Sequence, residues 1–131
     1  MAYTGPVRRW DLFWADLNPA VGSEQAGERR PVVVVSNDGV NASLDVVTVL
    51  SATKREGKKR KVYPFEVVLP AGAITAGHES IVMPQQIRTI SKMRLLERIG
   101  RLTDLAQQTE IENRILEHLG IQFEAEGLDD L

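Results

Sequence analysis

The residues best suited to chemistry lie in one short loop, residues 22–31. Two glycines bracket a serine, a glutamate and a glutamine, and two arginines follow directly before a proline. A guanidinium presents a planar fork of donors that matches phosphate oxygens, so this loop could hold an arginine against a phosphate. The alternative is a solvated loop in which Arg29 and Arg30 pair with Glu24 and Glu28, and composition alone favours that alternative.

Most other catalytic chemistry finds no matching residues in the sequence. The chain has no cysteine, which excludes disulfides, thiolate zinc sites and cysteine nucleophiles. Its two histidines, His78 and His118, are far apart, so a histidine-rich metal site is not expected. Phosphate-binding glycine loops, the G-x-S-x-G elbow and the H-E-x-x-H zinc motif are all absent. We therefore expect neither a metal ion nor a cofactor.

Charge is distributed unevenly along the chain, although the net charge is only −2. Residues 1–65 carry 10 Lys and Arg against 7 Asp and Glu, whereas residues 66–131 carry 6 against 11. Six of the eight residues in segment 54–61 are basic, including Lys58, Lys59, Arg60 and Lys61. This segment can be interpreted as the solvated tip of a hairpin or as a flap that faces phosphates.

The length of 131 residues suits a single domain, which we assign to residues 1–131. No purely apolar run exceeds the length of residues 32–35, which is far shorter than the roughly 20 residues that a membrane helix needs. The N-terminus also lacks the apolar core of a signal peptide. We therefore expect a soluble cytoplasmic protein without membrane contact.

The elements that must position the loop are predicted from short β-rich runs. Residues 12–17 indicate a first strand, and the valine-rich run 31–36 indicates a central strand buried on both faces. Two further runs, 45–51 and 62–69, flank the basic segment and favour a long hairpin. Short strands at 80–83 and 86–90, on either side of Pro84, and a last strand at 95–102 complete the prediction.

The C-terminal part indicates a helix. Thr103 is the expected N-cap, with Asp104 in the first turn and Gly120 just beyond the C-terminal end. One side of the helix is apolar at Leu105, Ile111, Ile115, Leu116 and Leu119. The sequence Asn37-Asp38-Gly39 predicts a turn, and the acidic tail 124–131 is expected to fray. Strands followed by one helix predict class α+β, with a small antiparallel barrel.

The loop sequence Gly22-Ser23-Glu24-Gln25-Ala26-Gly27, followed by Arg30-Pro31 and a valine strand, resembles the MazF/PemK family of toxin endoribonucleases. Further matching stretches occur in the family's order and spacing, and the resemblance covers roughly residues 9 to 120. They include residues 11–19, 63–69 and 86–90.

The resemblance implies an SH3-like antiparallel barrel that forms a homodimer and cleaves single-stranded RNA, often within a short sequence, without a metal. In this chemistry the RNA 2′-hydroxyl attacks the adjacent phosphorus and leaves a 2′,3′-cyclic phosphate and a 5′-hydroxyl. The implied partner is a cognate antitoxin, a small dimer whose acidic, partly disordered tail lies across the RNA groove. The basic segment could attract either polyanion.

Matched residue by residue, the family's catalytic arginine is Arg30, with a role in phosphate stabilisation and proton transfer. A guanidinium keeps its proton above pH 12, so stabilisation is the role that the chemistry favours. The family's threonine aligns with Ser51, which keeps the hydroxyl. Thr53 would point to the same face if the strand continued, and is the reserve candidate. Strand-end capping is the structural alternative for both hydroxyls.

Two departures from the family leave roles open. The loop has one extra residue between Gly27 and Pro31, so Arg29 could share the role of Arg30. Gln85 stands where some relatives carry an acidic base, which leaves Glu24 as the candidate base, or alternatively as a brace for the arginines.

The substrate contacts expected are Ser23, Gln25, Arg29, Thr53 and the basic residues of segment 58–61. The aromatic residues Trp10, Trp14, Tyr63 and Phe65 are interpreted as core or strand residues.

Two other functions compete on the same fold. One is a non-enzymatic gyrase poison like the CcdB relatives, but those end in a Trp-Gly-Ile type tail, and this chain ends in Leu128-Asp129-Asp130-Leu131. The other is a member that binds RNA or its partner without cleaving it, which the departures at Ser51 and Gln85 keep open.

Overall fold

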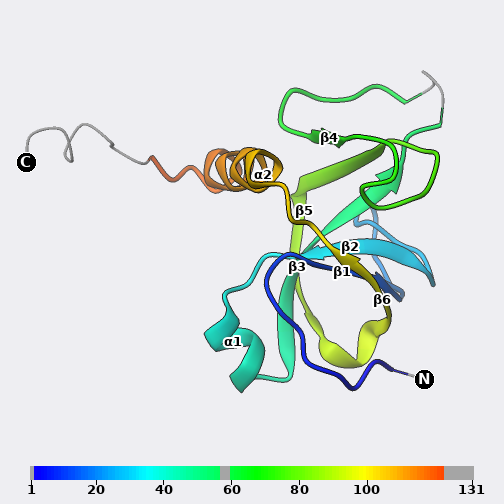
Figure 1. Cartoon of the computed structure of the whole chain (residues 1–131), viewed down its shortest axis with the longest axis vertical. Helices are drawn as coiled ribbons and strands as arrows, with labels where there is room; N and C mark the ends of the chain where they lie inside the picture. Colours follow the sequence, from blue (N-terminus) through cyan, green and yellow to red (C-terminus); the bar gives the residue numbers. More distant parts are fainter. Residues whose placement is uncertain (1, 57–59, 123–131) are drawn as a thin grey trace, which may run out of the picture.

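The computed structural model describes residues 2–56 and 60–122. Six antiparallel strands form one sheet in the order β4-β5-β3-β2-β1-β6, with two helices outside it (Figure 1). The elements are β1 Asp11–Ala15, β2 Arg30–Val34, α1 Asp38–Ser43, β3 Val46–Lys54, β4 Val67–Leu69, β5 Ser80–Ser91, the 3₁₀ turn η1 Lys92–Arg94, β6 Leu95–Arg101 and α2 Leu105–His118. The predicted class, an antiparallel β structure with a C-terminal helix, is confirmed.

The valine run of β2 lies in the interior of the sheet and buries both of its faces. Val32 and Val34 belong to one apolar cluster, together with Phe13 of β1. Val33 belongs to a second cluster, which also contains Ile111 of α2. Successive side chains of a strand point to opposite faces, so one short apolar run can contribute to two cores. The prediction of a central strand buried on both sides is confirmed.

The predicted long hairpin is wrong. Strand β3 is present, but its neighbours are β2 and β5, whereas β4 contains only Val67–Leu69 and pairs with β5. Residues before β4 form a turn in which the Glu66 backbone N–H donates to the Tyr63 carbonyl at 3.0 Å. Pro64 lies inside this turn and has no N–H for a sheet ladder, so the second arm of the expected hairpin cannot form.

The two short strands predicted around Pro84 are one continuous strand, β5. Ser51 pairs with Met83 and Val49 with Arg88, so residues 84–87 lie opposite Leu50 alone. This irregularity accommodates the proline, because the extra residues do not need to donate to the neighbouring strand. The strand therefore passes through the proline and changes register there.

The helix boundaries differ from the prediction at two places. Asn37 does not start a simple turn: its side-chain oxygen accepts from the Val40 N–H at 2.9 Å and caps α1. The N-cap of α2 is Asp104, whose carboxylate accepts from the Gln107 N–H at 3.0 Å, and not Thr103. Both side chains satisfy N–H groups that the first helical turn leaves free.

The C-terminal end of α2 agrees with the sequence. Gly120 follows the C-cap Leu119 with φ +69°, the left-handed conformation that favours glycine. Ile111 is fully buried, but Leu105 and Leu119, at the two ends of the apolar side, are exposed. The tail 124–131 lies outside the described residues. No helix in the described part of the chain is long and apolar enough to span a membrane.

Candidate nucleic-acid interface

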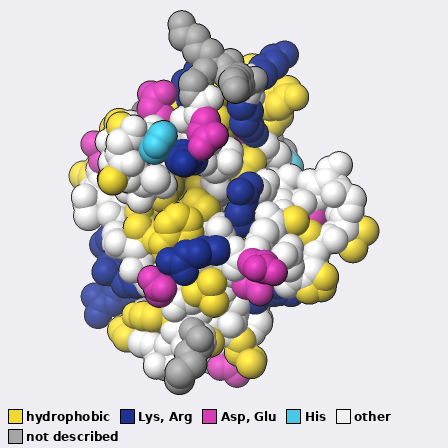
Figure 2. All heavy atoms as spheres, turned by 90° about the vertical axis from the view of Figure 1, so that its right-hand side faces the viewer, with side chains coloured by type: hydrophobic (Ala, Val, Ile, Leu, Met, Phe, Trp, Pro, Cys, Tyr) yellow, Lys and Arg dark blue, Asp and Glu magenta, His cyan; other side chains and the backbone are white. Residues whose placement is uncertain are grey.

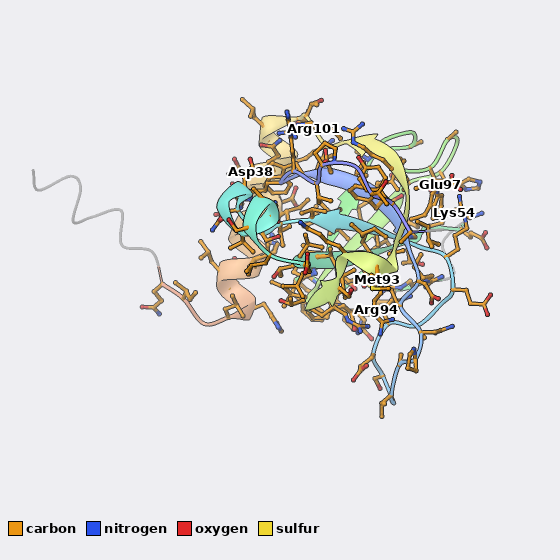
Figure 3. The ribbon with its side chains drawn as sticks, turned by 90° about the horizontal axis from the view of Figure 1, so that it is seen from below. Asp38, Lys54, Met93, Arg94, Glu97 and Arg101 are labelled. Carbon is orange, nitrogen blue, oxygen red and sulfur yellow. The ribbon has the colours of Figure 1, made fainter. Side chains whose placement is uncertain are left out.

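The loop between β1 and β2 is fixed at its root by hydrogen bonds to its own backbone and to η1. The Gly27 N–H donates to the Asn18 side chain at 2.9 Å, and the Gly27 carbonyl accepts from the Leu17 N–H at 2.8 Å. Arg94 of η1 donates to the carbonyls of Asp16, at 3.1 Å, and Asn18. Figure 3 shows Arg94 beside the start of this loop. The two ends of the loop are thus held together.

Gln86 of β5 holds the tip of the same loop. Its side-chain oxygen accepts from the Gln25 N–H at 3.0 Å, and its amide nitrogen donates to the Ser23 carbonyl at 3.1 Å. One glutamine side chain therefore pairs with the loop backbone much as a neighbouring strand would. Ser23, predicted to contact substrate, contributes its backbone carbonyl here and leaves its side chain at the surface.

Arg30, the first residue of β2, lies across Gly27. A Cβ at Gly27 would come within 2.6 Å of both Cγ and Cδ of Arg30, and Gly27 has φ +139°. When the Gln25 side-chain amide is turned so that its oxygen faces the guanidinium, the orientation that satisfies both of its polar atoms, this oxygen accepts from Arg30 Nε at 2.8 Å and also from Nη2. Gln25, predicted as a substrate contact, therefore orients the guanidinium.

The sheet register brings the predicted hydroxyls to the face that carries Arg30. Val32 of β2 pairs with Ser51 of β3. Arg30 lies two positions before Val32, and Thr53 lies two positions after Ser51. Since alternate residues share a face, Arg30, Ser51 and Thr53 point to the same side of the sheet. Ser51 is fully buried, and its hydroxyl has no hydrogen-bond partner among the described residues, whereas Thr53 is partly exposed.

A second arginine on this face was not singled out from the sequence. Arg88 of β5 pairs with Val49, which points to the same side of β3 as Ser51. Its Nη1 atom is buried and makes no hydrogen bond within the part of the chain that the structure describes. A buried donor without a partner is uncommon and calls for an explanation. An anionic ligand on this face would supply one.

Arg29 does not share the face of Arg30. Its guanidinium donates to both carboxylate oxygens of Glu97 at 3.3 Å and lies 4.9 Å from the ring centre of Trp14. These partners belong to β6 and β1, and adjacent residues of an extended chain point to opposite sides. The extra residue in the loop therefore does not bring Arg29 beside Arg30.

Glu24, the candidate base, is exposed, and its carboxylate accepts from the Val21 N–H at 3.3 Å. It thus contacts its own loop, and no described hydrogen bond or ion pair joins it to Arg29 or Arg30. No group of three His, Asp or Glu side chains among residues 2–56 and 60–122 could hold a metal ion.

The described part of the basic segment is folded against a buried carboxylate. Arg60 Nη1 and Nη2 donate to the two carboxylate oxygens of Glu66, each at 2.9 Å. The Tyr63 N–H and the Gln85 side-chain amide also donate to Glu66, at 3.0 and 2.6 Å. Arg60, predicted to contact RNA, is therefore a structural anchor of the segment. Lys58 and Lys59 lie outside the described residues.

Burial tends to raise the pKa of Glu66, since it removes water from the charged form. The hydrogen bonds from Arg60, Tyr63 and Gln85 and the positive charge of Arg60 outweigh burial, and the pKa of Glu66 is lowered. Gln85, which stands where some relatives carry an acid, thus helps to keep a neighbouring carboxylate ionised. The sequence gives no signal for this network.

The aromatic pair of the basic segment corrects another prediction. Tyr63 and Phe65 are not core residues: they are 44% and 42% exposed, and their rings stack at 5.1 Å with an angle of 8° between the planes. The ammonium of Lys61 lies 5.4 Å from the Tyr63 ring centre. Exposed aromatic rings beside a lysine are suited to stack on unpaired bases and to attract phosphates. Figure 2 shows one face of the molecule, on which Lys and Arg side chains lie next to hydrophobic side chains.

Comparisons with known proteins identify the family to which this chain belongs. The profile of the family described as "PemK-like, MazF-like toxin of type II toxin-antitoxin system" matches residues 8–119. The chain is 41% identical over 111 residues to Endoribonuclease MazF9 of Mycobacterium tuberculosis, covering 79% of this chain and 91% of the relative. It is 36% identical over 115 residues to Endoribonuclease MazF of Staphylococcus saprophyticus, covering 88% and 92%.

Among solved structures, MazF from Deinococcus radiodurans superposes with a TM-score of 0.75 at 27% sequence identity. That match covers 90% of this chain and 100% of the other. The chain belongs to the family of PemK-like, MazF-like toxins of type II toxin–antitoxin systems.

The lowered pKa of Glu66 predicts how stability depends on pH. The folded-state pKa lies below the ordinary value of 4.5, so this stabilisation is complete above about pH 4.5 and is lost as the pH falls through the folded-state pKa. Glu66→Gln should lower the free energy of unfolding by about 1–3 kcal/mol at pH 7. The difference from the wild type should shrink below pH 4.5.

Urea unfolding between pH 7 and pH 3 measures this difference. Glu79→Gln is the control, because the Glu79 carboxylate is half exposed in its pair with Arg55 and should contribute little. A difference between wild type and Glu66→Gln that stays constant over the whole range would contradict the assigned role of Glu66.

Proposed function

We propose that this protein is a toxin endoribonuclease that cleaves single-stranded RNA, mRNA in particular, in the cytoplasm and thereby inhibits translation. The observation that carries the proposal is the guanidinium of Arg30, held by Gln25 over Gly27 on the face shared by Ser51 and Thr53. The family and the two relatives named endoribonuclease support it.

The proposed reaction needs no nucleophile from the protein. The RNA 2′-oxygen forms a bond to the adjacent phosphorus, and the bond from phosphorus to the 5′-oxygen breaks. One proton leaves the 2′-hydroxyl and one is gained by the 5′-oxygen, which gives a 2′,3′-cyclic phosphate and a 5′-hydroxyl. Arg30, assisted by Arg88, stabilises the negative charge that develops on the phosphorus oxygens.

Ser51, Glu66 and Glu24 differ in what they can contribute to the proposed reaction. The Ser51 hydroxyl has no hydrogen-bond partner among the described residues, and we assign it a hydrogen bond to a phosphate oxygen. Glu66 is enclosed by donors and has a lowered pKa, so it is poorly suited to accept a proton. Glu24 is exposed in the loop that precedes Arg30, and we assign it the role of general base. The proposed reaction uses no metal.

The surface around this face suggests how a single strand is bound. Tyr63 and Phe65 can stack on splayed bases, and Lys61 can attract the phosphate backbone. That Lys58 and Lys59 also contact RNA stays a prediction from the sequence, because both lie outside the described residues. Ser23, whose side chain is exposed, can contact a base edge. We further propose that two copies form a homodimer and that an antitoxin with an acidic, disordered tail occupies the same surface, since the family is one of toxin–antitoxin systems.

A second candidate is a member that binds RNA without cleaving it. The burial of Ser51 favours this alternative, because a hydroxyl inside the chain must become accessible before it can reach a phosphate. Cleavage and binding assays on the same preparation separate the two candidates.

Arg30→Ala should lower RNA cleavage by more than about 100-fold, because it removes a charge partner of the transition state. Arg29→Ala, the matched control, should retain most of the activity, since Arg29 pairs with Glu97. The assay is cleavage of a mixed-sequence single-stranded RNA in EDTA, with analysis of the product ends.

Loss of activity in Arg29→Ala but not in Arg30→Ala would overturn the assignment of the two arginines. RNA binding by folded wild-type protein without cleavage of several RNAs would favour the second candidate.

Ser51→Ala should reduce the cleavage rate by roughly 10- to 100-fold, because it removes a hydrogen bond to a charged phosphate oxygen. Thr53→Ala should reduce the rate less. Because Ser51 Oγ has no partner within the described chain, its removal should leave the fold intact. Single-turnover rates and melting temperatures of both variants provide the test. The reverse order of rates, with both variants folded, would move the assigned role to Thr53.

Gly27→Ala should reduce cleavage by roughly 10- to 100-fold, because the new methyl group would displace the Arg30 side chain. Gly22→Ala is a matched control in the same loop: Gly22 has φ +58°, but its substitution meets nothing within 4 Å. Equal activity losses in the two variants would show that loop strain, and not the position of Arg30, governs the rate.

A further inference from the structure

A hollow of about 840 Å³ lies beside Asp11, the first residue of β1. The loop that contains Gln25 and Gly27 follows the opposite end of this strand. The N-terminal arm, α1, η1 and β6 line the hollow. Four cationic side chains reach its lining, against two carboxylates; they are Arg8, Lys92, Arg98 and Arg101, against Asp11 and Asp38. The hollow therefore has an excess of positive charge, and the proposed function leaves it without a role.

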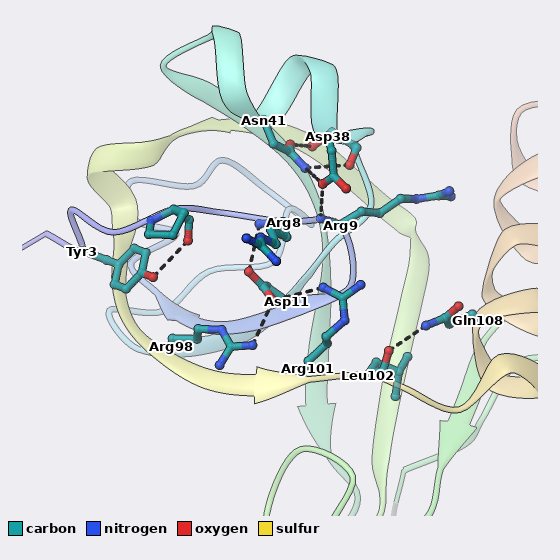
Figure 4. Close-up of polar contacts among 12 residues, drawn as sticks. Tyr3, Arg8, Arg9, Asp11, Asp38, Asn41, Arg98, Arg101, Leu102 and Gln108 are labelled. Carbon is teal, nitrogen blue, oxygen red and sulfur yellow. Dashed lines mark hydrogen bonds and ion pairs between the residues drawn. The ribbon is translucent and has the colours of Figure 1, made fainter.

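The buried carboxylate of Asp11 orients the arginines of this hollow. Its side chain is only 3% exposed, and Oδ1 accepts from Arg98 Nη2 at 3.1 Å and lies 3.7 Å from Arg101 Nη1. The other oxygen accepts from the Arg8 backbone N–H at 2.9 Å. Figure 4 shows Arg8, Arg98 and Arg101 gathered around Asp11. One anion thus holds two guanidinium groups in place.

The backbone beside Asp11 is strained. Trp10 has φ +74°, a left-handed conformation that is rare for a bulky residue, and it is largely buried. Its N–H donates to the Val34 carbonyl at 2.7 Å, and its carbonyl accepts from the Leu102 N–H at 2.9 Å. Such strain persists where the surrounding structure enforces it, often at functional sites. Here the strained residue directly precedes Asp11, whose carboxylate pairs with two arginines of the hollow.

The carboxylate of Asp38, the second acidic group of the hollow, already accepts hydrogen bonds from neighbouring residues. Asp38 accepts from the Arg9 backbone N–H at 2.8 Å and from the Asn41 amide at 3.4 Å. Lys92 donates to the Asn41 carbonyl, and the Arg8 guanidinium makes no hydrogen bond with any residue that the structure describes. The cations of the hollow therefore retain donors for a further anion.

We propose that this hollow binds a phosphate group, either of a free phosphorylated compound such as a nucleotide or of the RNA backbone. Oriented guanidinium forks suit the tetrahedral oxygens of phosphate, and Lys92 adds a compact positive charge. Where the phosphate belongs to RNA, the inference rests on the proposed function and extends the bound length of the substrate.

The hollow is separate from the face of Arg30. Asp11 and Ala15 stand at opposite ends of β1, about 13 Å apart at the usual rise of a strand, and Ala15 is the residue that pairs with Arg30. In the view of Figure 3, Asp38 and Arg101 lie close together and away from Arg94, which holds the loop root.

The test is a calorimetric titration of the full chain with pyrophosphate, in an Arg30→Ala background that removes the first site. Saturable binding is expected, weakened at least about tenfold by Arg8→Gln, which uncovers no buried charge, and by Arg101→Gln. Arg114→Gln on α2, a matched loss of one positive charge outside the hollow, should leave binding unchanged.

RNA cleavage distinguishes the two sources of phosphate. With Arg30 intact, the ratio of KM for a long RNA to KM for a short RNA is compared between the wild type and Arg8→Gln. A raised ratio assigns the site to the RNA backbone, and an unchanged ratio with weakened pyrophosphate binding assigns it to a free phosphorylated compound.

The inference would be overturned if pyrophosphate binding is not saturable and the KM ratio is unchanged. It would also be overturned if Arg114→Gln weakens pyrophosphate binding as much as Arg8→Gln does. If the protein cleaves no RNA, the pyrophosphate titration alone tests whether the hollow binds phosphate. Failure of the proposed function can therefore be distinguished from failure of this inference.

Discussion

A charged side chain at the end of a strand is useful in chemistry only if something fixes its direction. For Arg30 that constraint is met by two neighbours: Gln25, whose oxygen accepts from the guanidinium, and Gly27, whose missing side chain leaves room for the arginine stem. The rest of the loop serves this arrangement, because Gln86 holds its tip and Arg94 holds its root. The buried sheet beneath supplies the rigid edge from which β2 begins.

The two glutamines that follow Pro84 on β5 have different tasks. Residues 84–87 lie opposite a single residue of β3, so the strand changes register in this stretch. Gln85 donates to Glu66 and so supports the segment before β4, whereas Gln86 pairs with the loop around Gln25. A regular strand would also place successive side chains on opposite faces, but it would not accommodate a proline in the middle of the ladder.

The sequence predicts the parts of this protein that depend on local patterns. The valine run, the loop before it and the common face of Ser51 and Thr53 follow from strand alternation and from the family resemblance. Strand pairing cannot be predicted in the same way, because a β-rich run alone does not show which strand lies beside it. The run 62–69 does not pair with β3, since Pro64 lies in a turn, and β5 takes that place.

Long-range pairing of polar groups is also hidden from the sequence. Arg60 and Lys61 are equivalent by composition, yet Arg60 binds a buried glutamate and Lys61 approaches an aromatic ring. The exposure of Tyr63 and Phe65 follows from a turn, and aromatic residues are more often buried, so the pattern favours the wrong interpretation. For α2 the competing caps Thr103 and Asp104 are adjacent, and only the backbone geometry distinguishes them.

The position of Gln85 and Gln86 side by side on β5 has a thermodynamic consequence. Strand β5 holds both the loop before Arg30 and the segment that contains Tyr63 and Phe65; we call these two segments the arms. Much of their conformational entropy is therefore already lost when the chain folds. A flexible ligand that settles between them has to order mainly itself. Its affinity then depends less on the number of contacts than on how stiff β5 keeps the two arms.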